Sequence, residues 1–376
     1  MKVEQIYQLT NDIAKEILGE SAVVNEDLSN VVDIGKEIQN TASMDKYVKS
    51  LIDHIGKVVF VDRPYKGSAP SVFMDSWEYG SILEKVTMDK YPEAEENDAW
   101  QLEDGRSYDP NIFTAPQVSA KFFNDKNTFD IPMSFAERQV KSAFDSVSQL
   151  NAFFSMIETA IENSMTIRID NLVMATICNA IALTLNGSGS TPRVVHLLTE
   201  YNTKFSESLT AAQALTTPEF VRWAAFRMAQ YESRMKKLST LFNAGGKERF
   251  TPQDKLNIIL LDEFALAADV YLQSDVYHNE FTKLPQAETV PYWQGSGTDY
   301  AFDSTSAINI THGNVTVSDD GIIGVMFDKD ALGVTCMDRR VTSNYNPKGE
   351  FYNNWYKFDC GYFNDLNENF IVFIVD

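Results

Sequence analysis

The chain has 376 residues, of which 44% are hydrophobic, so it can bury a sizeable core in one elaborate domain or in two to three ordinary ones. Its 53 acidic residues outnumber 32 basic ones, which gives a formal net charge of -21. Tight binding to phosphate groups requires Lys and Arg, so this balance argues against a nucleic-acid-binding protein, without excluding a protein that lies beside nucleic acid.

Residues 1–57 are predicted to form an N-terminal arm of two short amphipathic helices. Ile6, Leu9, Ile13 and Ile17 stand at helical spacing, and acidic residues lie among them, unlike the uninterrupted apolar core of a signal peptide. No segment of the chain is expected to span a membrane.

The residues that most often bind metals or cofactors are scattered along the chain. The three cysteines are Cys178, Cys336 and Cys360, and the four histidines are His54, His196, His278 and His312. Their spacing contains neither a disulfide framework nor a metal-binding motif, and isolated cysteines favour a reducing compartment. The glycine-rich motifs that bind phosphates are absent from the sequence, so we expect no cofactor.

From Val58 the pattern of apolar residues changes from helical spacing to that of short extended pieces. In residues 70–89 apolar and polar residues alternate enough to predict a strand. Between Asp75 and Ile112 eleven acidic residues stand against three basic ones. The same tract carries five aromatic residues, which are Trp77, Tyr79, Tyr91, Trp100 and Tyr108. Aromatic residues at this density are unusual in a disordered acidic tail, which favours a long two-stranded excursion with its return strand over Val118–Ser134.

A lone hairpin is marginally stable in water, so this excursion is expected to pack on a neighbouring subunit through its exposed aromatic residues. The alternative is a lid that packs on its own domain. The candidate inter-subunit contacts are Trp77, Tyr79, Tyr91 and Trp100, together with the basic pair Arg339 and Arg340. That basic pair could bind acidic residues of an adjacent subunit or face solvent.

The segment Asn151–Asn186 is predicted to form one long helix. Apolar residues from Phe154 to Ile177 follow one another at steps of three or four, and the segment contains neither Pro nor Gly. Polar residues occupy its other faces, so it is expected to lie on the protein surface with its apolar stripe buried. The alternative is two ordinary helices that meet near Met165–Ile169, where β-branched residues cluster.

A second helix is predicted to begin after Thr217, with Pro218 in its first turn, and to end at the NAGG sequence Asn243–Gly246. A buried strand over Asn257–Leu261 then turns directly into a helix. Asp262 and Glu263 stand at the end of that strand, where paired carboxylates could carry out hydrolysis. The simpler interpretation is that Asp262 caps the following helix.

Three β-like runs close the sequence. They contain the run IIGVMFDKDALGVT, the doublet Arg339–Arg340, the turn at Asn346–Pro347, the run NNWYKFDCGYF and an apolar last strand. In this order, these features resemble the C-terminal part of tailed-bacteriophage major capsid proteins. The resemblance implies an α+β fold with an N-terminal arm, a long β-hairpin called the E-loop, a spine helix in a peripheral domain and a mixed α/β axial domain.

The same resemblance implies a division of the chain along its length. The arm covers 1–57, the start of the peripheral domain and the E-loop cover 58–136, and the peripheral domain with its spine helix covers 137–190. The axial domain covers 191–319, and C-terminal strands over 320–376 complete both domains.

In function, the resemblance implies a structural protein and not an enzyme. It would assemble in the host bacterial cytoplasm into hexamers and pentamers of an icosahedral-type shell that becomes part of the virion. It would enclose double-stranded phage DNA without binding it specifically. Separate scaffold and portal proteins, and possible decoration proteins, are the implied partners. The alternatives are an encapsulin-like nanocompartment shell and a soluble acidic hydrolase that uses Asp262 and Glu263.

Overall fold

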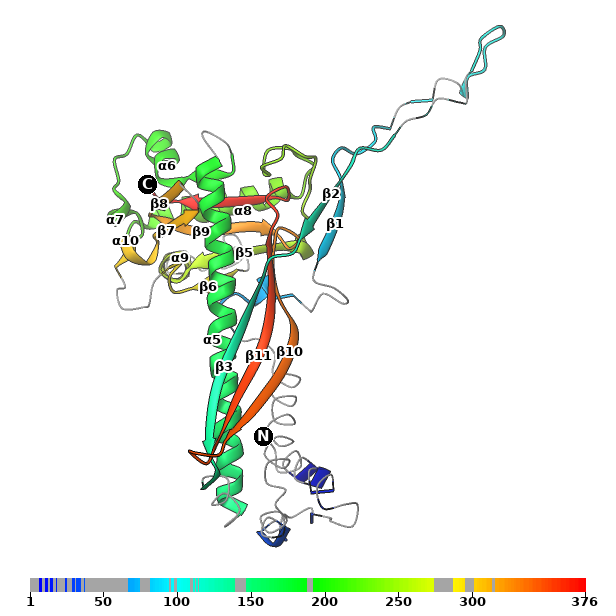
Figure 1. Ribbon diagram of the computed structural model, residues 1–376. Coiled ribbons are helices and arrows are strands. Elements are labelled where there is room, and N and C mark those ends of the chain that lie inside the picture. The colour runs from blue at the N-terminus through cyan, green and yellow to red at the C-terminus, as the bar shows by residue number, and fades with distance from the viewer. Residues whose placement is uncertain are drawn as a thin grey trace. The chain divides into compact units, whose positions relative to one another are not determined.

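The computed structural model describes residues 67–74, 82–94, 96–97, 100–108, 111, 113, 115–138, 147–187, 192–273, 287–294, 301–312 and 315–376, with isolated positions between 7 and 37 (Figure 1). The apolar positions of the first predicted arm helix and the extended pieces predicted before Gly67 lie outside these residues. The arm therefore stays a prediction.

The chain divides into two compact units. Unit 1 comprises Met1–Trp77, Lys126–Val173 and Val334–Gly361, and unit 2 comprises Glu78–Asp125, Met174–Gly333 and Tyr362–Asp376. Each unit is therefore built from three separate stretches of sequence. The five-part domain division predicted above is finer than this one and stays a prediction.

One continuous helix, α5, covers Val147–Gly187 and contributes to both units. It is 41 residues long, so the alternative of two helices that meet near Met165 is wrong. Ile157, Ile161, Met165 and Ile169 are all buried, as the spacing of the apolar residues predicts. No Pro or Gly interrupts the helix before Gly187, where it ends.

α5 is also apolar enough to raise the question of a membrane span, contrary to the sequence-based expectation. Ser155–Gly187 is long and apolar enough to cross a bilayer. However, 56% of its most apolar window is buried inside the protein, as in the core helix of a soluble fold. In unit 1, Phe153 of this helix packs edge-on against Phe135, with ring centroids 5.6 Å apart.

Unit 1 contains a three-stranded sheet in the order β10-β11-β3. The strands are β3 (Lys126–Ala136), β10 (Leu332–Asn346) and β11 (Phe351–Asn364). Alternate residues of β11 are buried, as expected for a sheet with one face on the core. The turn predicted at Asn346–Pro347 is confirmed, and the Asn346 side-chain oxygen accepts hydrogen bonds from the backbone N–H groups of Lys348 and Gly349.

The predicted return strand Val118–Ser134 is in fact two strands with different partners. β2 (Val118–Phe123) pairs with β1 (Leu83–Met88) in unit 2, whereas β3 pairs with β11 in unit 1. The change of partner takes place at Asn124 and Asp125. Five consecutive polar residues, Asn124–Thr128, interrupt the period-2 pattern at this break, so the prediction of a single strand passed over a signal that the sequence contains.

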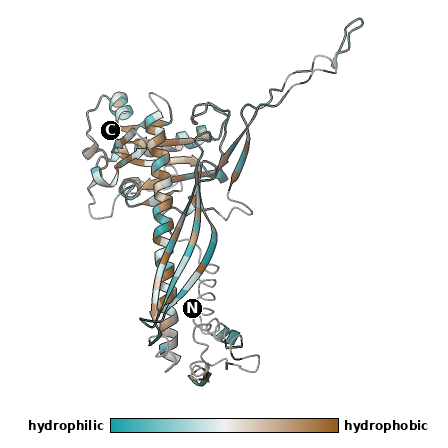
Figure 2. Ribbon diagram, in the orientation of Figure 1, coloured by the Kyte–Doolittle hydropathy of each residue, from teal (hydrophilic) through white to brown (hydrophobic). Residues whose placement is uncertain are grey.

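Unit 2 is organised around a five-stranded mixed sheet in the order β4-β12-β9-β5-β6. The strands are β4 (Val194–His196), β5 (Leu256–Leu261), β6 (Glu288–Val290), β9 (Ile322–Asp328) and β12 (Phe370–Ile374). Every residue of β9 and of β12 is buried, and both strands are strongly hydrophobic in Figure 2. Such continuous apolar runs are typical of strands covered on both faces.

The remaining described elements of unit 2 are helices and a hairpin. They are α6 (Leu197–Phe205), α7 (Ala211–Ala214), α8 (Pro218–Met235), the short 3-10 helix η3 (Gln253–Lys255), α9 (Asp262–Gln273), α10 (Phe302–Thr305), β7 (Ile308–His312) and β8 (Val315–Asp319). α8 and α9 form one core with the sheet, in which Phe220, Phe264 and Phe373 are fully buried. Gly321 requires its glycine, because its φ is +71° and a Cβ there would meet the Val375 carbonyl oxygen.

α8 begins where the sequence predicts, with Thr217 at the N-cap position and Pro218 in the first turn. Its predicted end at Asn243–Gly246 is wrong, because the helix ends at Met235. The chain then turns back, and Ser239 pairs with Arg249 in an isolated β-bridge. The strand predicted over Asn257–Leu261 and the helix directly after it are confirmed as β5 and α9.

Candidate assembly surface

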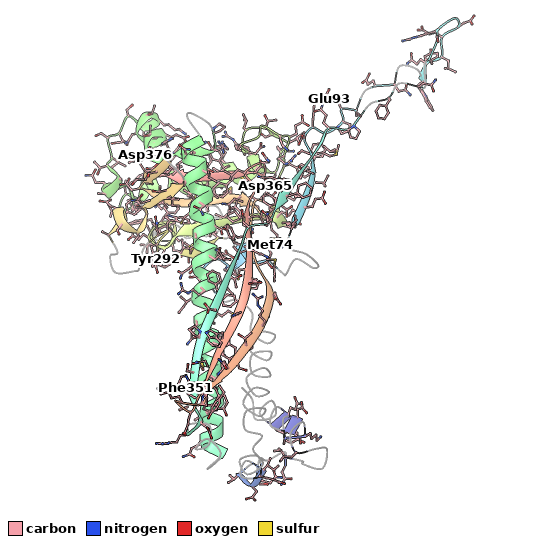
Figure 3. The ribbon with its side chains drawn as sticks, viewed as in Figure 1. Met74, Glu93, Tyr292, Phe351, Asp365 and Asp376 are labelled. Atoms are coloured by element: carbon pink, nitrogen blue, oxygen red, sulfur yellow. The ribbon has the colours of Figure 1, made fainter. Side chains whose placement is uncertain are left out.

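The segment between β1 and β2, which we call the excursion (Asp89–Gln117), is the most exposed part of the chain that the structure describes. β1 and β2 pair antiparallel, and the backbone N–H of Asp89 donates to the Gln117 carbonyl to close the pairing. Figure 1 shows the excursion as a long connection that leads away from these two strands, and Glu93 is labelled on it in Figure 3.

The described part of the excursion exposes large apolar side chains of the kind that a folded protein usually buries. Trp100 is 87% exposed, Leu102 82% and Phe113 87%. On β1 and β2 themselves, Val86, Val118 and Phe122 are also exposed. Clustered apolar exposure of this kind marks surfaces that another molecule covers.

The base of the excursion is fixed to the β11–β12 connection by ion pairs of low exposure within unit 2. The Lys85 ammonium group lies 3.0 Å from a carboxylate oxygen of Asp365 and 3.0 Å from one of Glu368. It also donates to the Asp330 carbonyl oxygen. Lys121, on β2, binds the second oxygen of Asp365 at 3.1 Å. Asp365, whose position is labelled in Figure 3, therefore joins both strands of the hairpin to the rest of the unit.

A second set of contacts joins the start of the excursion to residues 247–250. Lys247 pairs with Asp89 at 2.6 Å, and the Tyr91 backbone N–H donates to Glu248 at 2.8 Å. The Tyr91 ring also contacts Phe250, with centroids 6.3 Å apart. The excursion is thus firmly held at its base, while its described distal residues are exposed.

Removing Lys85 is expected to loosen this base. Lys85→Ala leaves the buried Asp365 and Glu368 carboxylates with fewer cations, so we expect a loss of about 3 kcal/mol in the free energy of unfolding. Urea denaturation of the purified subunit measures the loss. The matched control is Lys255→Ala, which breaks an exposed Lys–Asp pair with Asp330 and should cost less than about 1 kcal/mol. Equal losses in both variants would contradict the anchoring role.

The same anchor should respond to acid in a defined direction. Burial tends to raise the pKa of Asp365, but the charges of Lys85 and Lys121 more than offset this and hold the pKa below its ordinary value. A depressed folded-state pKa gives a stabilisation that is present above the unfolded value of about 3.9 and is lost as the pH falls through the folded-state pKa.

We therefore expect the stability difference between wild type and Lys85→Ala to shrink as the pH falls below the unfolded value of about 3.9 and through the lower folded-state pKa of Asp365. Urea titrations at about pH 6 and about pH 3 measure it. A difference of the same size at both pH values would show that Lys85 acts through packing and not through the charge of Asp365.

The sequence-predicted contact residues are placed as follows. Trp77 and Tyr79 lie outside the described residues. Trp100 is almost fully exposed, whereas Tyr91 is partly covered by Phe250 of its own chain. Arg340 already makes ion pairs within its own chain, to Asp338 at 2.6 Å and to Asp359 at 2.9 Å.

Arg339, next to Arg340 on β10, is exposed. The role of the six predicted contact residues between subunits stays a prediction. Leu102 and Phe113 were not selected from the sequence, because the contact candidates were drawn from residues 75–100 of this tract and from the basic pair; the exposure of these two side chains is visible only in the fold.

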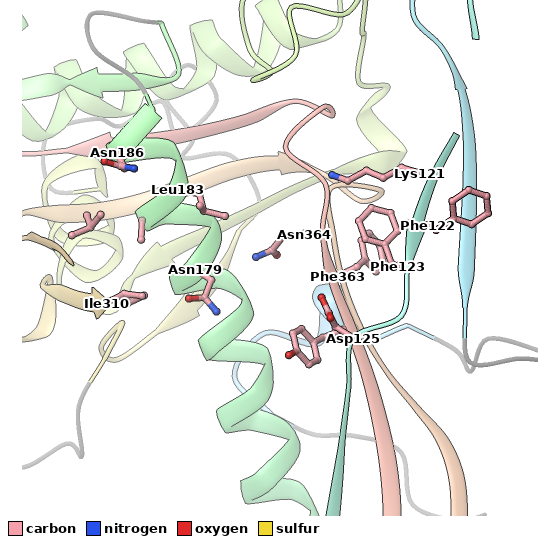
Figure 4. A pocket seen from close by; sticks show the side chains of 13 residues that line it. Lys121, Phe122, Phe123, Asp125, Asn179, Leu183, Asn186, Ile310, Phe363 and Asn364 are labelled. Carbon is pink, nitrogen blue, oxygen red and sulfur yellow. The ribbon is translucent and has the colours of Figure 1, made fainter. Parts of the chain in front are cut away.

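Unit 2 also contains a cavity of about 470 Å³ between α5, β2, the β7–β8 hairpin and the end of β11. Figure 4 shows Asn179, Leu183 and Asn186 of α5 on one side, with Phe363 and Asn364 of β11 on the other. Its lining combines apolar side chains with carboxamides, and it holds no described cluster of titratable groups that could bind a metal.

Comparison with known proteins decides the class of the chain. Residues 10–374 match the family described as Phi29-like phage major capsid protein. The chain belongs to this family. It is a phage major capsid protein, a structural subunit of the virion shell and not an enzyme. No curated protein matches the chain.

Solved structures agree with this capsid protein in fold. The capsid structure of Staphylococcus phage Andhra is 9% identical, with a TM-score of 0.50, and the match covers 84% of this chain and 86% of that one. A structure described as head fiber and inner core protein gp22 of native bacteriophage P68 gives the same identity, TM-score and coverage. The α+β capsid fold implied by the sequence is therefore confirmed.

The residues proposed for hydrolysis have a structural place in this capsid protein. Asp262 and Glu263 form the first turn of α9, where negative charge is favourable for the helix dipole. Burial raises the pKa of Glu263. Asp262 is the first residue of the helix and not a flanking cap, which refines the sequence interpretation. The family is structural, so neither the hydrolase nor the encapsulin-like alternative is favoured.

Proposed function

We propose that this capsid protein assembles into hexamers and pentamers of an icosahedral-type shell, and that its excursion is the E-loop, which packs on a neighbouring subunit. The observation that supports this most directly is the exposure of Trp100, Leu102 and Phe113 on a segment whose base is held by ion pairs. Weak contacts of this kind, repeated around closed rings, add up to a stable shell.

We propose further that assembly takes place in the host bacterial cytoplasm with a separate scaffold and a portal protein, and that the finished shell encloses double-stranded phage DNA. Electron micrographs of the purified full-length protein, alone and after co-expression with the other phage head proteins, test the proposal. Closed particles built from rings of six and five subunits support it. A compact monomer under both conditions would refute it.

The DNA is proposed to be enclosed without specific binding. With a net charge of -21, the unassembled subunit is expected to show no measurable affinity for duplex DNA, because Lys and Arg contacts to phosphate dominate such binding. A mobility-shift titration at about 0.15 M salt measures this. Micromolar or tighter binding would contradict a passive wall and would point to a basic surface formed by the fold.

A further inference from the structure

Two of the three cysteines, which are far apart in sequence, meet inside unit 1. Cys336 lies on β10 and Cys360 on β11, and these strands are neighbours in the three-stranded sheet. Their sulfur atoms are 3.1 Å apart. Cys336 is 5% exposed and Cys360 is fully buried. Both thiols are free.

This separation is about 1 Å longer than a disulfide bond, whose length is about 2.0 Å. β10 and β11 are neighbouring strands, and the closest side-chain pairs across such strands have Cβ atoms about 4.5 Å apart, the upper end of the spacing found in disulfides. A small movement of the two side chains would therefore bring the sulfur atoms to bonding distance without separating the strands.

The two thiols are not equivalent. The hydrogen bond from Cys360 lowers the pKa of Cys336, and the positive charge of Arg339 acts in the same direction against the effect of burial. The pKa of Cys360 is raised by the same hydrogen bond and by burial. Cys336 is also the slightly exposed member of the pair, whereas Cys360 is fully buried, so Cys336 is the sulfur that a small oxidant reaches first.

The third cysteine provides an internal reference. Cys178, on α5, is buried, and its thiol donates to the Trp293 carbonyl oxygen at 3.2 Å. Burial raises its pKa to about 12. It is assigned to unit 2, whereas Cys336 and Cys360 belong to unit 1. We therefore expect it to stay reduced under conditions that oxidise the other two.

We propose that Cys336 and Cys360 form an oxidation site that takes a small hydroperoxide as oxidant and closes into a disulfide across β10 and β11. The Cys336 thiolate attacks one peroxide oxygen, the O–O bond breaks, and the products are a sulfenic acid on Cys336 and, after protonation, one water molecule or alcohol. Cys360 then loses its proton and attacks the sulfenic sulfur, the S–O bond breaks, and a water molecule leaves. The two thiols together lose two electrons, which reduce the peroxide.

The redox conditions that the two thiols meet follow from the proposed function, in which the subunit assembles in the host cytoplasm and then leaves the cell in the virion. Thiols stay reduced in cytosol, whereas disulfides persist on virions and in other oxidising surroundings. The bond would close a covalent loop through the β10–β11 hairpin of unit 1 and restrict the separation of these strands. The two cysteines would thus stay reduced while the subunit folds, and the disulfide would form after the particle leaves the cell.

Thiol counting on the full-length protein tests the proposal. Reduced protein is treated with hydrogen peroxide, denatured in iodoacetamide without a reductant, and weighed by intact-mass spectrometry. We expect the number of alkylated thiols to fall from three to one, with a peptide cross-linked between Cys336 and Cys360. Three alkylated thiols after treatment, or a cross-link that includes Cys178, would overturn the proposal.

Variants test the order of the two steps. Cys178→Ser should form the same cross-link as the wild type. Cys360→Ser should leave Cys336 as a sulfenic acid, which a dimedone probe captures, whereas Cys336→Ser should give no adduct on Cys360. An adduct on Cys360 in Cys336→Ser, with none on Cys336 in Cys360→Ser, would contradict the assigned order. The wild-type thiol count remains decisive if a variant fails to fold.

Discussion

Replacing Lys90–Pro116 with an Asn-Gly turn is expected to abolish closed shells while leaving a folded subunit. Asp89 and Gln117 are hydrogen-bonded across the base of the excursion, so a two-residue turn can join them without changing the β1–β2 pairing. The deletion removes the exposed side chains of Trp100, Leu102 and Phe113 and none of the described core. Negative-stain microscopy measures shell formation, and circular dichroism with size-exclusion chromatography measures folding.

Two further variants keep the full length of the excursion and test whether its apolar side chains are what shell formation requires. The triple Ala substitution of Trp100, Leu102 and Phe113 should prevent closure of the shell in the same way. The matched control on the same segment is the double Ala substitution of Glu103 and Arg106, an exposed ion pair whose loss should cost at most about 1 kcal/mol. Normal particles from the triple variant would exclude the excursion as the main contact between subunits.

Ile161→Asp is expected to prevent folding of unit 1. Ile161 is fully buried in the apolar stripe of α5, and an unpaired carboxylate there costs several kcal/mol, a large fraction of the stability of an ordinary domain. The soluble yield and the far-ultraviolet circular dichroism of the purified chain measure the effect.

The control introduces the same residue two positions along the same helix. Asn163 is exposed, and Asn and Asp have similar helix propensities, so Asn163→Asp should change stability by less than about 0.5 kcal/mol. If both variants accumulate as soluble protein with identical spectra, the assigned buried face of α5 is wrong.

The sequence correctly predicted features that depend on residues close to one another in the chain. The apolar stripe of α5 repeats every three or four residues, so its face and approximate ends followed from the sequence alone. Thr217 and Pro218 marked the start of α8 for a similarly local reason. The NAGG sequence did not mark its end, because the pairing of Ser239 with Arg249 reverses the chain earlier.

Features that depend on distant residues could not be predicted. β3 pairs with β11 along its full length although more than two hundred residues separate them. The polar run Asn124–Thr128 marks a break in the alternation, but it does not indicate which strand the next segment pairs with. The anchor of the excursion is similar, because Lys85 and Asp365 are 280 residues apart in sequence. The sequence shows that the excursion is rich in aromatic residues, but only the structure shows which of its side chains are exposed.

The strand order of unit 2 has a consequence for synthesis of the protein. β12 (residues 370–374) lies between β4 and β9, so the sheet stays open until the ribosome has passed residue 374. At about 5–20 residues per second, roughly 10–35 s separate the emergence of β4 from that of β12. During this interval β4 and β9 lack the strand that joins them, and the unpaired apolar edges of the unfinished sheet are open to premature contacts with other chains.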